Sequence, residues 1–453
     1  MVDYSFIDKN LQDSNTYNSQ DINNIDFDYL VIYSSHAIEI YNDYLKYGVS
    51  KNKIIFVLKI NGEYKFIKNK FIFKFEKLKN KIINLENKES FSFYIANLIS
   101  KIYHFKTDKF VFISRLHFDS NIKYLYLYLD KNNIKTTIIT SNKEHLNSLK
   151  SYGYNCLDLT TIKGQIYFIN ASKIITTDGG KIMDKRRVKA EQKIVQLLHG
   201  VLIKNVPDQR AINSYQYFFT SSNNIIENLY KHKFTSEYFL NFGHPRNDVL
   251  FNSISTKQEE LFCDMKVYDM IKTKEKKVIV YAPTFRTYGF NDFPIDFNTF
   301  NKFLEKMNAI FIIKLHNQIY TDLNHYIFET ASDCKNIILH NRDNDIYPVL
   351  NKTDLLISDY SSIAYDFLIL NKPMLFFTYD KQRYVKTRGE FSFDYDEFTP
   401  GIQVDTQNKL ENEIYNIFNG IDSYKDKRLK LLNYYYDFID NKSSQRIMEQ
   451  ICI

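Results

Sequence analysis

Short apolar runs alternate with polar, turn-forming residues along most of the chain. In the middle of the chain, apolar runs of strand length lie at residues 110–116, 135–140, 173–177, 194–198 and 216–220. Stretches with helical spacing lie among them, at 118–132, 143–152 and 164–171. A second series of strands is expected at 277–282, 309–315, 337–339, 355–357 and 374–377. This alternation predicts mostly parallel sheets with helices on both faces.

The two series have different neighbours in the sequence. Before the first, residues 28–35, 37–49 and 53–60 are typical of a strand, a helix and a strand, and a helix is expected at 87–104. Between the two series, residues 252–276 are polar and Lys-rich and predict a helical bridge. We therefore expect a small α/β region at the N-terminus and a domain boundary near residue 250.

Composition and charge narrow the class of protein. The chain has 453 residues, 44% hydrophobic and 25% charged, which is typical of a globular protein with more than one domain. No apolar run approaches the roughly 18 residues of a membrane-spanning helix. The first residues, MVDYSFIDKNLQDSNTYN, lack the basic start and apolar core of a secretory signal, so we expect a cytoplasmic protein.

The charge and the cysteine spacing bear on nucleic-acid binding, on anionic partners and on disulfide or metal sites. The net charge of +7 is modest, and without a recognised module it argues against nucleic-acid binding. The Lys-rich stretch at residues 65–81 could touch an anionic lipid or polymer, or it could be a solvated face. The four cysteines lie far apart and match neither a disulfide framework nor a paired metal site.

The most informative turn follows the strand at 355–357. Asp359, Tyr360, Ser361 and Ser362 precede a helix expected at 363–370. Two hydroxyls and unpaired backbone N–H groups at the start of a helix can bind a phosphate. A serine at such a position can also simply cap the helix, and this stretch alone leaves both interpretations open.

Other strands also end in groups that hold phosphate or move a proton. His199 and Gly200 follow the strand at 194–198, although a lone histidine is more often structural. Arg246 lies in the turn FGHPRND, where it could clamp a phosphate or pair with Asp248. The remaining groups at strand ends are Pro283, Thr284, Arg286, Lys314 and His316. Because ligands bind at the carboxyl ends of parallel strands, these residues predict one shared cleft.

Several segments together resemble one known family. They are ITTDGG through VQLLHG, FGHPRNDVL, VIVYAPTFR, IIKLH, ISDYSSIAYDFLILNKPMLFFTYD and RGEFSFDYDEFTPG, in the order and spacing of that family. The chain resembles the CDP-glycerol glycerophosphotransferases, which are teichoic-acid and capsule polymerases of the GT-B type. The resemblance covers roughly residues 110–418 and leaves out the first hundred.

The resemblance implies an α/β fold of GT-B type, in which two Rossmann-like domains face each other across a cleft. An accessory α/β region would occupy residues 1–104. The acceptor domain would follow at 105–250 and the CDP-donor domain at 251–420. Helices in 421–453 could pack back on the first domain.

The implied reaction transfers glycerol phosphate from CDP-glycerol to a hydroxyl of a growing polymer and releases CMP. By their match to the family's motifs, His199 and His316 would be catalytic. The donor would be bound by Gly200, Arg246, Pro283, Thr284, Arg286, Lys314, Ser361, Ser362 and Asp366. Asp359 and Arg388 are further candidates, and the roles of Arg286 and Arg388 are the least certain. Asp366 could instead complement the dipole of its helix.

No cofactor is implied. Because no carboxylate pair has the spacing of a Mg²⁺ site, we expect metal-independent transfer, with Asp359 and Asp366 as the alternative ligands. The expected partners are CDP-glycerol or a related CDP-polyol and a polyol-phosphate or saccharide acceptor. The protein could also touch the inner face of the cell membrane peripherally.

The chain departs from the family pattern beside both histidines. Leu198, Val201 and Leu202 stand where the family has Trp, Thr and Pro, and Asn317 stands where it has Pro. These changes favour a different donor pocket, so CDP-ribitol is the first alternative donor. A GT-B glycosyltransferase that uses a nucleotide sugar and a binding module without catalysis are the other hypotheses.

Overall fold

The computed structural model describes residues 29–33, 37–60, 63–70, 72–73, 88–102, 110–113, 120–177, 192–210, 214–252, 262–273, 275–284, 286, 288, 293–315, 330–341 and 343–452. His316 and Asn317, singled out in the sequence, lie outside this set. Contacts divide the chain into two compact units, residues 1–94 and 95–453. The division falls inside helix α3 (Lys88–Ile102) rather than at residue 104, because one helix continues across it.

The smaller unit contains a three-stranded sheet and one helix packed on it. Strand β2 (Ile54–Ile60) pairs in parallel with β1 (Leu30–Ile32) and antiparallel with β3 (Glu63–Ile67). The hydrophobic core of this unit joins α1 (Ala37–Lys46) to one face of the sheet. The expected strand, helix and strand are therefore present, and β3 begins just before the Lys-rich stretch.

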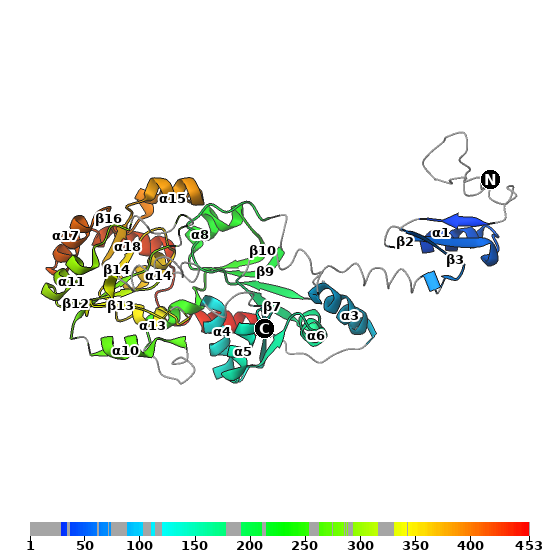
Figure 1. The fold of residues 1–453 in the computed structure, drawn as a ribbon, viewed down its shortest axis with the longest axis horizontal. Helices are drawn as coiled ribbons and strands as arrows, with labels where there is room; N and C mark the ends of the chain where they lie inside the picture. The colour runs from blue at the N-terminus through cyan, green and yellow to red at the C-terminus, as the bar shows by residue number, and fades with distance from the viewer. Residues whose placement is uncertain are drawn as a thin grey trace. The chain divides into compact units, whose positions relative to one another are not determined.

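The larger unit contains two fully parallel sheets, each with helices around it (Figure 1). The first has seven strands in the order β10-β9-β8-β7-β4-β5-β6. Its strands are β4 (Phe110–Ile113), β5 (Thr136–Thr140), β6 (Cys156–Asp158), β7 (Lys173–Thr176), β8 (Lys193–Gln196), β9 (Ser214–Phe219) and β10 (Thr235–Leu240). Its helices are α4 (Ser120–Lys131), α5 (Lys143–Ser151), α6 (Ile162–Asn170), α8 (Asn223–Asn228), η3 (Tyr230–His232) and η4 (Pro245–Leu250).

The second sheet has six strands in the order β13-β12-β11-β14-β15-β16. They are β11 (Lys277–Tyr281), β12 (Ala309–Ile313), β13 (Ile337–Leu339), β14 (Leu355–Ser358), β15 (Met374–Phe377) and β16 (Ile402–Val404). The helices of this lobe are α10 (Met265–Lys272), α11 (Phe297–Lys306), α13 (Tyr347–Leu350), α14 (Ile363–Phe367), η5 (Leu368–Leu370), α15 (Lys381–Arg388), α16 (Tyr395–Phe398) and α17 (Gln407–Phe418).

The strand order of the second sheet locates its ligand-binding edge. The chain adds strands in one direction from β11 and then returns to add β14 on the other side of β11. In such doubly wound sheets the loops after these two central strands separate, and ligands bind in the crevice between them. The loop at 283–286 and the turn at 359–362 are these two loops.

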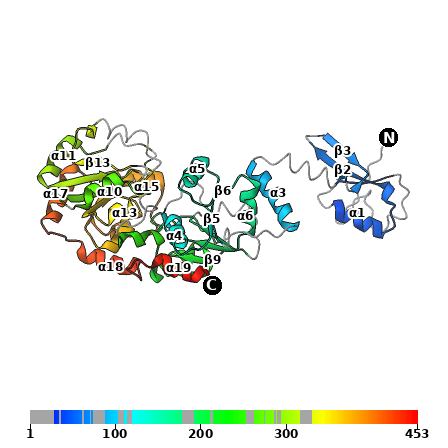
Figure 2. The same ribbon diagram turned by 90° about the horizontal axis from the view of Figure 1, so that it is seen from below.

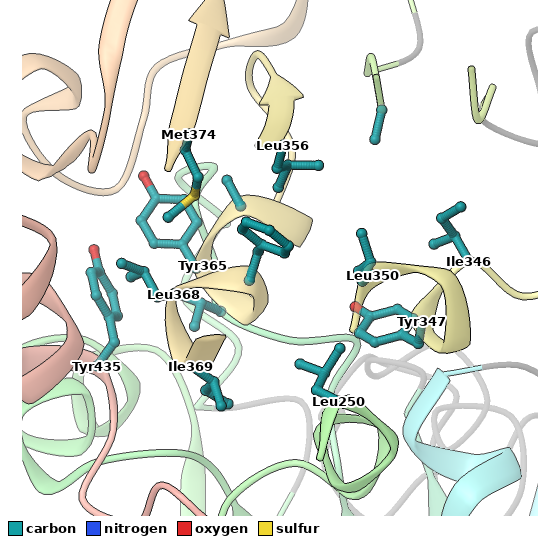
Figure 3. Close-up of a cluster of buried hydrophobic side chains, with 14 of the residues drawn as sticks. Leu250, Ile346, Tyr347, Leu350, Leu356, Tyr365, Leu368, Ile369, Met374 and Tyr435 are labelled. Carbon is teal, nitrogen blue, oxygen red and sulfur yellow. The ribbon is translucent and has the colours of Figure 1, made fainter. Parts of the chain in front are cut away.

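The two lobes are packed together by a shared hydrophobic core. One buried cluster contains Val201 and Tyr230 from the first lobe together with Tyr365 and Leu368 from the second. Figure 3 shows the same contact at Leu250 of η4, which lies beside α13. Residue 250 therefore lies inside one compact unit, and no boundary between compact units falls there.

The last two helices return toward the first lobe. Helix α18 (Lys425–Tyr435) contacts α8, and α19 (Ser443–Cys452) contacts α4 and η4. The red α19 lies beside the cyan α4 in both views of the ribbon (Figures 1 and 2). Its Ile447 and Ile451 enter the core of the first sheet. None of the helices formed by the described residues has the length and apolar character needed to cross a bilayer.

Candidate active site

Asp359 connects the two loops that follow the central strands β11 and β14 of the second sheet. Its carboxylate accepts hydrogen bonds from the Thr284 N–H, at 2.9 Å, and from the Thr284 hydroxyl. It also pairs with Arg286, and the side chains of both charged residues are fully buried. Asp359 therefore fixes the loop at 283–286 and does not present its charge to solvent.

Arg286 lies between two carboxylates. Its Nε is 2.9 Å from Oδ2 of Asp380, and Nη1 pairs with Asp359. Tyr360, next to Asp359 in the turn, donates its hydroxyl to Asp380 at 3.0 Å. Burial lowers the pKa of Arg286, but the negative charge of Asp359 outweighs this effect and the pKa is raised overall. The guanidinium is thus held as a cation that shapes the loop.

The hydroxyls of Ser361 and Ser362 make no hydrogen bond with any other residue that the structure describes. Ser361 and Ser362 are half-buried at the start of α14, which continues directly into η5. Ser362 is the N-cap residue by position, but its side chain makes no capping hydrogen bond. Its ψ of −15° is helical, whereas a capping serine usually has an extended backbone. The simple capping interpretation is therefore wrong for Ser362.

Asp366 lies farther along α14 and forms a buried ion pair with Arg246 of η4. Tyr347 donates its hydroxyl to the same carboxylate at 2.7 Å, and the guanidinium of Arg246 lies 5.2 Å from the Tyr347 ring centre. Burial raises the pKa of Asp366, which the charge of Arg246 opposes. The pair links the two lobes, so Asp366 is not a surface charge that complements the helix dipole.

The alternative partner of Arg246 is engaged elsewhere. The Asp248 carboxylate accepts the backbone N–H groups of Ser443 and Ser444, at 2.9 and 2.8 Å, at the start of α19. The interpretation that Arg246 pairs with Asp248 is therefore wrong. Residues close in sequence are held by different parts of the fold.

Arg246 fixes the backbone of the turn at His199. Nη1 of Arg246 donates to the backbone carbonyl of His199, while the imidazole of His199 is exposed. Gly200 has φ of +126°, and a Cβ added there would lie 2.0 Å from Nη2 of Arg246. Leu198 has φ of +51°, a conformation that non-glycine residues rarely adopt. Only glycine fits after His199, and the arginine sets the path of the turn.

Asn121 of α4 holds the same turn, and sequence reasoning missed it. Its buried amide donates to the carbonyls of Leu197 and Leu198, at 3.1 and 2.8 Å. Its Oδ1 accepts the N–H of Arg246 at 3.2 Å. One asparagine therefore positions both the histidine turn and the arginine turn, and no local pattern in the sequence marks it.

Lys204 is a second residue that the sequence analysis did not identify. The chain around it pairs with the other lobe, since Ser392 donates its N–H to the carbonyl of Ile203 at 2.7 Å. Its Nζ lies 5.2 Å from the Tyr384 ring centre and has no hydrogen bond or ion pair with any residue that the structure describes. Burial, together with the charge of Arg388, lowers the pKa of Lys204 to about 8.

Lys314 is held by backbone carbonyls at the end of β12. Its Nζ donates to the carbonyls of Asn341 and Asn344, at 2.9 and 2.7 Å. Burial lowers the pKa of Lys314 to about 8. Arg388, at the end of α15, is exposed, and Pro283 is buried beside the half-buried Thr284. A hollow of about 680 Å³ beside α18 is lined by none of these residues, so it is not the predicted site.

Residues 93–453 match the family model described as CDP-Glycerol:Poly(glycerophosphate) glycerophosphotransferase. The chain belongs to this family. The match confirms the resemblance that the motifs indicated, and it leaves most of the smaller unit outside.

Two curated relatives and one solved structure extend the match. The chain is 27% identical to a teichoic acid poly(ribitol-phosphate) polymerase of Bacillus spizizenii, over 83% of this chain and 63% of that one. It is 29% identical to the teichoic acid ribitol-phosphate polymerase TarK of Staphylococcus aureus, over 80% of this chain and 72% of that one. The chain thus spans roughly two thirds of the length of these curated relatives.

A solved structure of the wall teichoic acid polymerase TagF superposes with a TM-score of 0.64. The sequences are 22% identical, and the alignment covers 86% of this chain and 98% of that one. Together with the two parallel sheets described above, this likeness confirms the α/β fold of GT-B type.

Proposed function

We propose that this protein transfers glycerol phosphate from CDP-glycerol to a hydroxyl of a growing teichoic-acid or capsule polymer. Family membership supports the reaction class. The observation that carries the proposal is the ion pair of Arg246 with Asp366. It ties the turn of His199 to helix α14, which Ser361 and Ser362 directly precede. A candidate base and candidate phosphate ligands are thereby connected through one side chain.

In the proposed reaction, the acceptor hydroxyl attacks the β-phosphorus of the donor in line. A P–O bond forms to the acceptor oxygen, the bond between β-phosphorus and bridging oxygen breaks, and its electron pair leaves with CMP. The exposed imidazole of His199 takes the proton of the attacking hydroxyl. The Ser361 and Ser362 hydroxyls and the cation of Lys204 stabilise the charge that develops on the phosphates.

The charged residues found in ion pairs have a positioning role in this proposal. Arg246 and Asp366 set the distance between the lobes, and Arg286 and Asp359 set the loop at Thr284. The carboxylates that could have held a metal are already bonded to arginines, which supports metal-independent transfer. Gly200, Pro283, Lys314 and Arg388 stay candidates for donor binding, and His316 stays a second catalytic candidate.

A specific observation favours CDP-ribitol as a second donor. Two curated relatives are named as ribitol-phosphate polymerases. In this chain the buried, apolar Val201 follows Gly200, where the resemblance predicts threonine. An apolar side chain cannot donate a hydrogen bond to the donor, so the polyol pocket here need not match that of a glycerol-phosphate enzyme.

A donor screen with the purified protein tests the proposal. CDP-glycerol, CDP-ribitol and UDP-sugars are each supplied with and without a short glycerol-phosphate acceptor. We expect CMP release from CDP-glycerol that requires acceptor and survives EDTA. Faster release from CDP-ribitol would assign the second donor, and UDP release from a UDP-sugar would overturn the proposal. The polymer acceptor and the peripheral membrane contact stay predictions here.

A further inference from the structure

Among the residues that the structure describes, no helix packs on one face of the sheet of the smaller unit, although Val57 in the middle of that face is buried. Ile32, Phe56 and Ile67 point toward α1 and are buried. Side chains alternate along a strand, so their neighbours point to the opposite face. There Val31, Tyr64 and Phe66 are 46%, 55% and 62% exposed. A contiguous patch of large, exposed apolar side chains often marks a binding surface.

Lysines lie over the aromatic rings at both ends of this face. Nζ of Lys59 lies 5.4 Å from the ring centre of Tyr64, which contacts Tyr33 edge-on at 5.6 Å. At the other end, Lys68 lies 4.3 Å from the ring centre of Tyr29, and its Nζ donates to the Tyr29 hydroxyl at 3.1 Å. The two lysines are therefore separated by a band of aromatic and aliphatic surface.

The charge of this face has one sign among the described strand residues. Pairing of β2 with β3 places Lys59 opposite Tyr64 and Ile60 opposite Glu63. Glu63 therefore belongs to the other set of alternating positions, together with Ile67. Tyr64, which lies opposite Lys59, and Lys68, just after the end of β3, are four residue steps apart, or roughly 13 Å along an extended strand. A single phosphate cannot meet both cations at that separation, whereas a chain of phosphodiesters can.

We propose that this aromatic face, formed by Tyr29, Tyr33, Lys59, Tyr64, Phe66 and Lys68, binds the polyanionic polyol-phosphate chain. The phosphates contact the two lysines, and the polyol carbons pack on the rings, with tyrosine hydroxyls near the polyol hydroxyls. The inference rests on the proposed function, because a polyol-phosphate chain is the acceptor and product of that reaction. The face belongs to a part of the chain that the family model leaves largely unmatched.

A consequence for product length follows. A second attachment point keeps a released chain end near the enzyme and raises its effective concentration. Loss of the face should therefore shorten the products without changing the turnover of a short acceptor. This separates the aromatic face from the active site.

The test uses the full-length protein and the variant Tyr64→Thr/Phe66→Thr, in which threonine keeps the preference for strand structure. Tyr238→Thr is the matched control, because Tyr238 is 47% exposed on the edge strand β10 of the other unit. Binding of fluorescent poly(glycerol phosphate) is measured by anisotropy at two salt concentrations. Thermal unfolding checks that each variant is folded.

We expect the double variant to bind the polymer roughly tenfold more weakly than the control, which is about the contribution of two aromatic contacts. Adding Lys59→Gln should also reduce the salt dependence of binding. Equal polymer binding by double variant and control, or no polymer binding by the wild type, would overturn the proposal. The proposal would also be overturned if the double variant lost binding to phosphatidylglycerol vesicles or to a single-stranded oligonucleotide but kept binding to the polymer. CMP release with a short acceptor is measured separately. If no CMP were released in that assay, the result would count against the proposed function and not against polymer binding by the aromatic face.

Discussion

Two aspartates flank the serine turn, and each is paired with an arginine in a different way. Asp359 comes before the turn and pairs with Arg286 inside the second lobe. Asp366 comes after the turn and pairs with Arg246 of the first lobe. Both carboxylates are buried and both arginines are cations. Both are buried pairs of a carboxylate with a guanidinium, although Arg286 also pairs with Asp380, and only the pair of Asp366 crosses between the lobes.

The two ion pairs therefore position different parts of the candidate site. The pair of Asp359 holds Thr284 and the loop beside the expected donor site. The pair of Asp366 reaches the carbonyl of His199, through Arg246. Damage to the first pair should therefore weaken donor binding. Damage to the second should also move His199, the candidate base, away from the acceptor hydroxyl that it deprotonates.

The largest effect is expected from Arg246→Met. The change leaves Asp366 buried without its cation, which should destabilise the protein by about 3–5 kcal/mol. Because the His199 carbonyl loses its donor as well, kcat should fall more than the donor KM rises. Urea unfolding and steady-state CMP release measure the two effects.

A double variant shows whether the two effects have separate causes. Arg246→Met/Asp366→Asn removes both charges, so most of the lost stability should return. The His199 turn still lacks its hydrogen-bond donor, so kcat should stay low. Full recovery of kcat in the double variant would show that Arg246 acts only through stability.

A smaller effect is expected from Asp359→Asn. The amide oxygen can still accept the Thr284 N–H, but Arg286 keeps only the charge of Asp380. We expect a loss of about 1–3 kcal/mol. The donor KM should rise while kcat changes little, as measured by CMP release over a range of CDP-glycerol concentrations.

Asp354→Asn is the matched control for this change. Asp354 accepts the N–H of Val278 in the same lobe, and the structure shows no arginine paired with it among the described residues. The control should leave the donor KM unchanged. A similar rise in KM for both variants would mean that the ion pair with Arg286 has no special part in donor binding.

Substitutions of Lys204 test whether its single positive charge, near the contact between the lobes, contributes to donor binding. Lys204→Met should raise the donor KM roughly tenfold, the effect of losing one phosphate contact worth about 1.4 kcal/mol. Lys204→Arg keeps the charge and should restore most of the affinity. The same KM in all three proteins would remove Lys204 from the proposed site.

The smallest effect concerns pH. Because burial lowers the pKa of Lys204 to about 8, its positive charge is lost as the pH rises through that value. The kcat/KM for CDP-glycerol, which reports groups in the free enzyme, should therefore fall severalfold between about pH 7 and pH 9. Lys204→Arg stays charged and should show a smaller fall. Lys314, whose pKa burial also lowers to about 8, is expected to contribute to the fall in kcat/KM that this variant still shows.

Much of the fold could be predicted from local patterns. The strands at β8, β11 and β14 are short, apolar and bounded by turns, so their position follows from the residues alone. The pattern of apolar residues does not predict β3, β6, β10 and β16. Two of them have three residues, and β10 is an exposed edge strand without an apolar run. Such strands are defined by pairing with a neighbour, which a local pattern does not contain.

The candidate site was predicted by residue type and position, but its internal connections were not. Arg246 was expected to contact a phosphate or Asp248, which is close in the sequence. Its partner Asp366 is distant in the sequence and comes near only when the two lobes pack. Asn121 and Lys204 were missed for the same reason, because their roles depend on groups supplied by other elements. Motifs identify strand ends well, whereas ion pairs across lobes need the coordinates.

The central claim is that His199 acts as the base in transfer from CDP-glycerol. The most direct measurement compares His199→Asn with the wild type, using CMP release for turnover and calorimetry for donor binding. The account predicts a fall in kcat of roughly a hundredfold or more with nearly unchanged affinity for CDP-glycerol. A variant that releases CMP at the rate of the wild type, from the same bound donor, would contradict it.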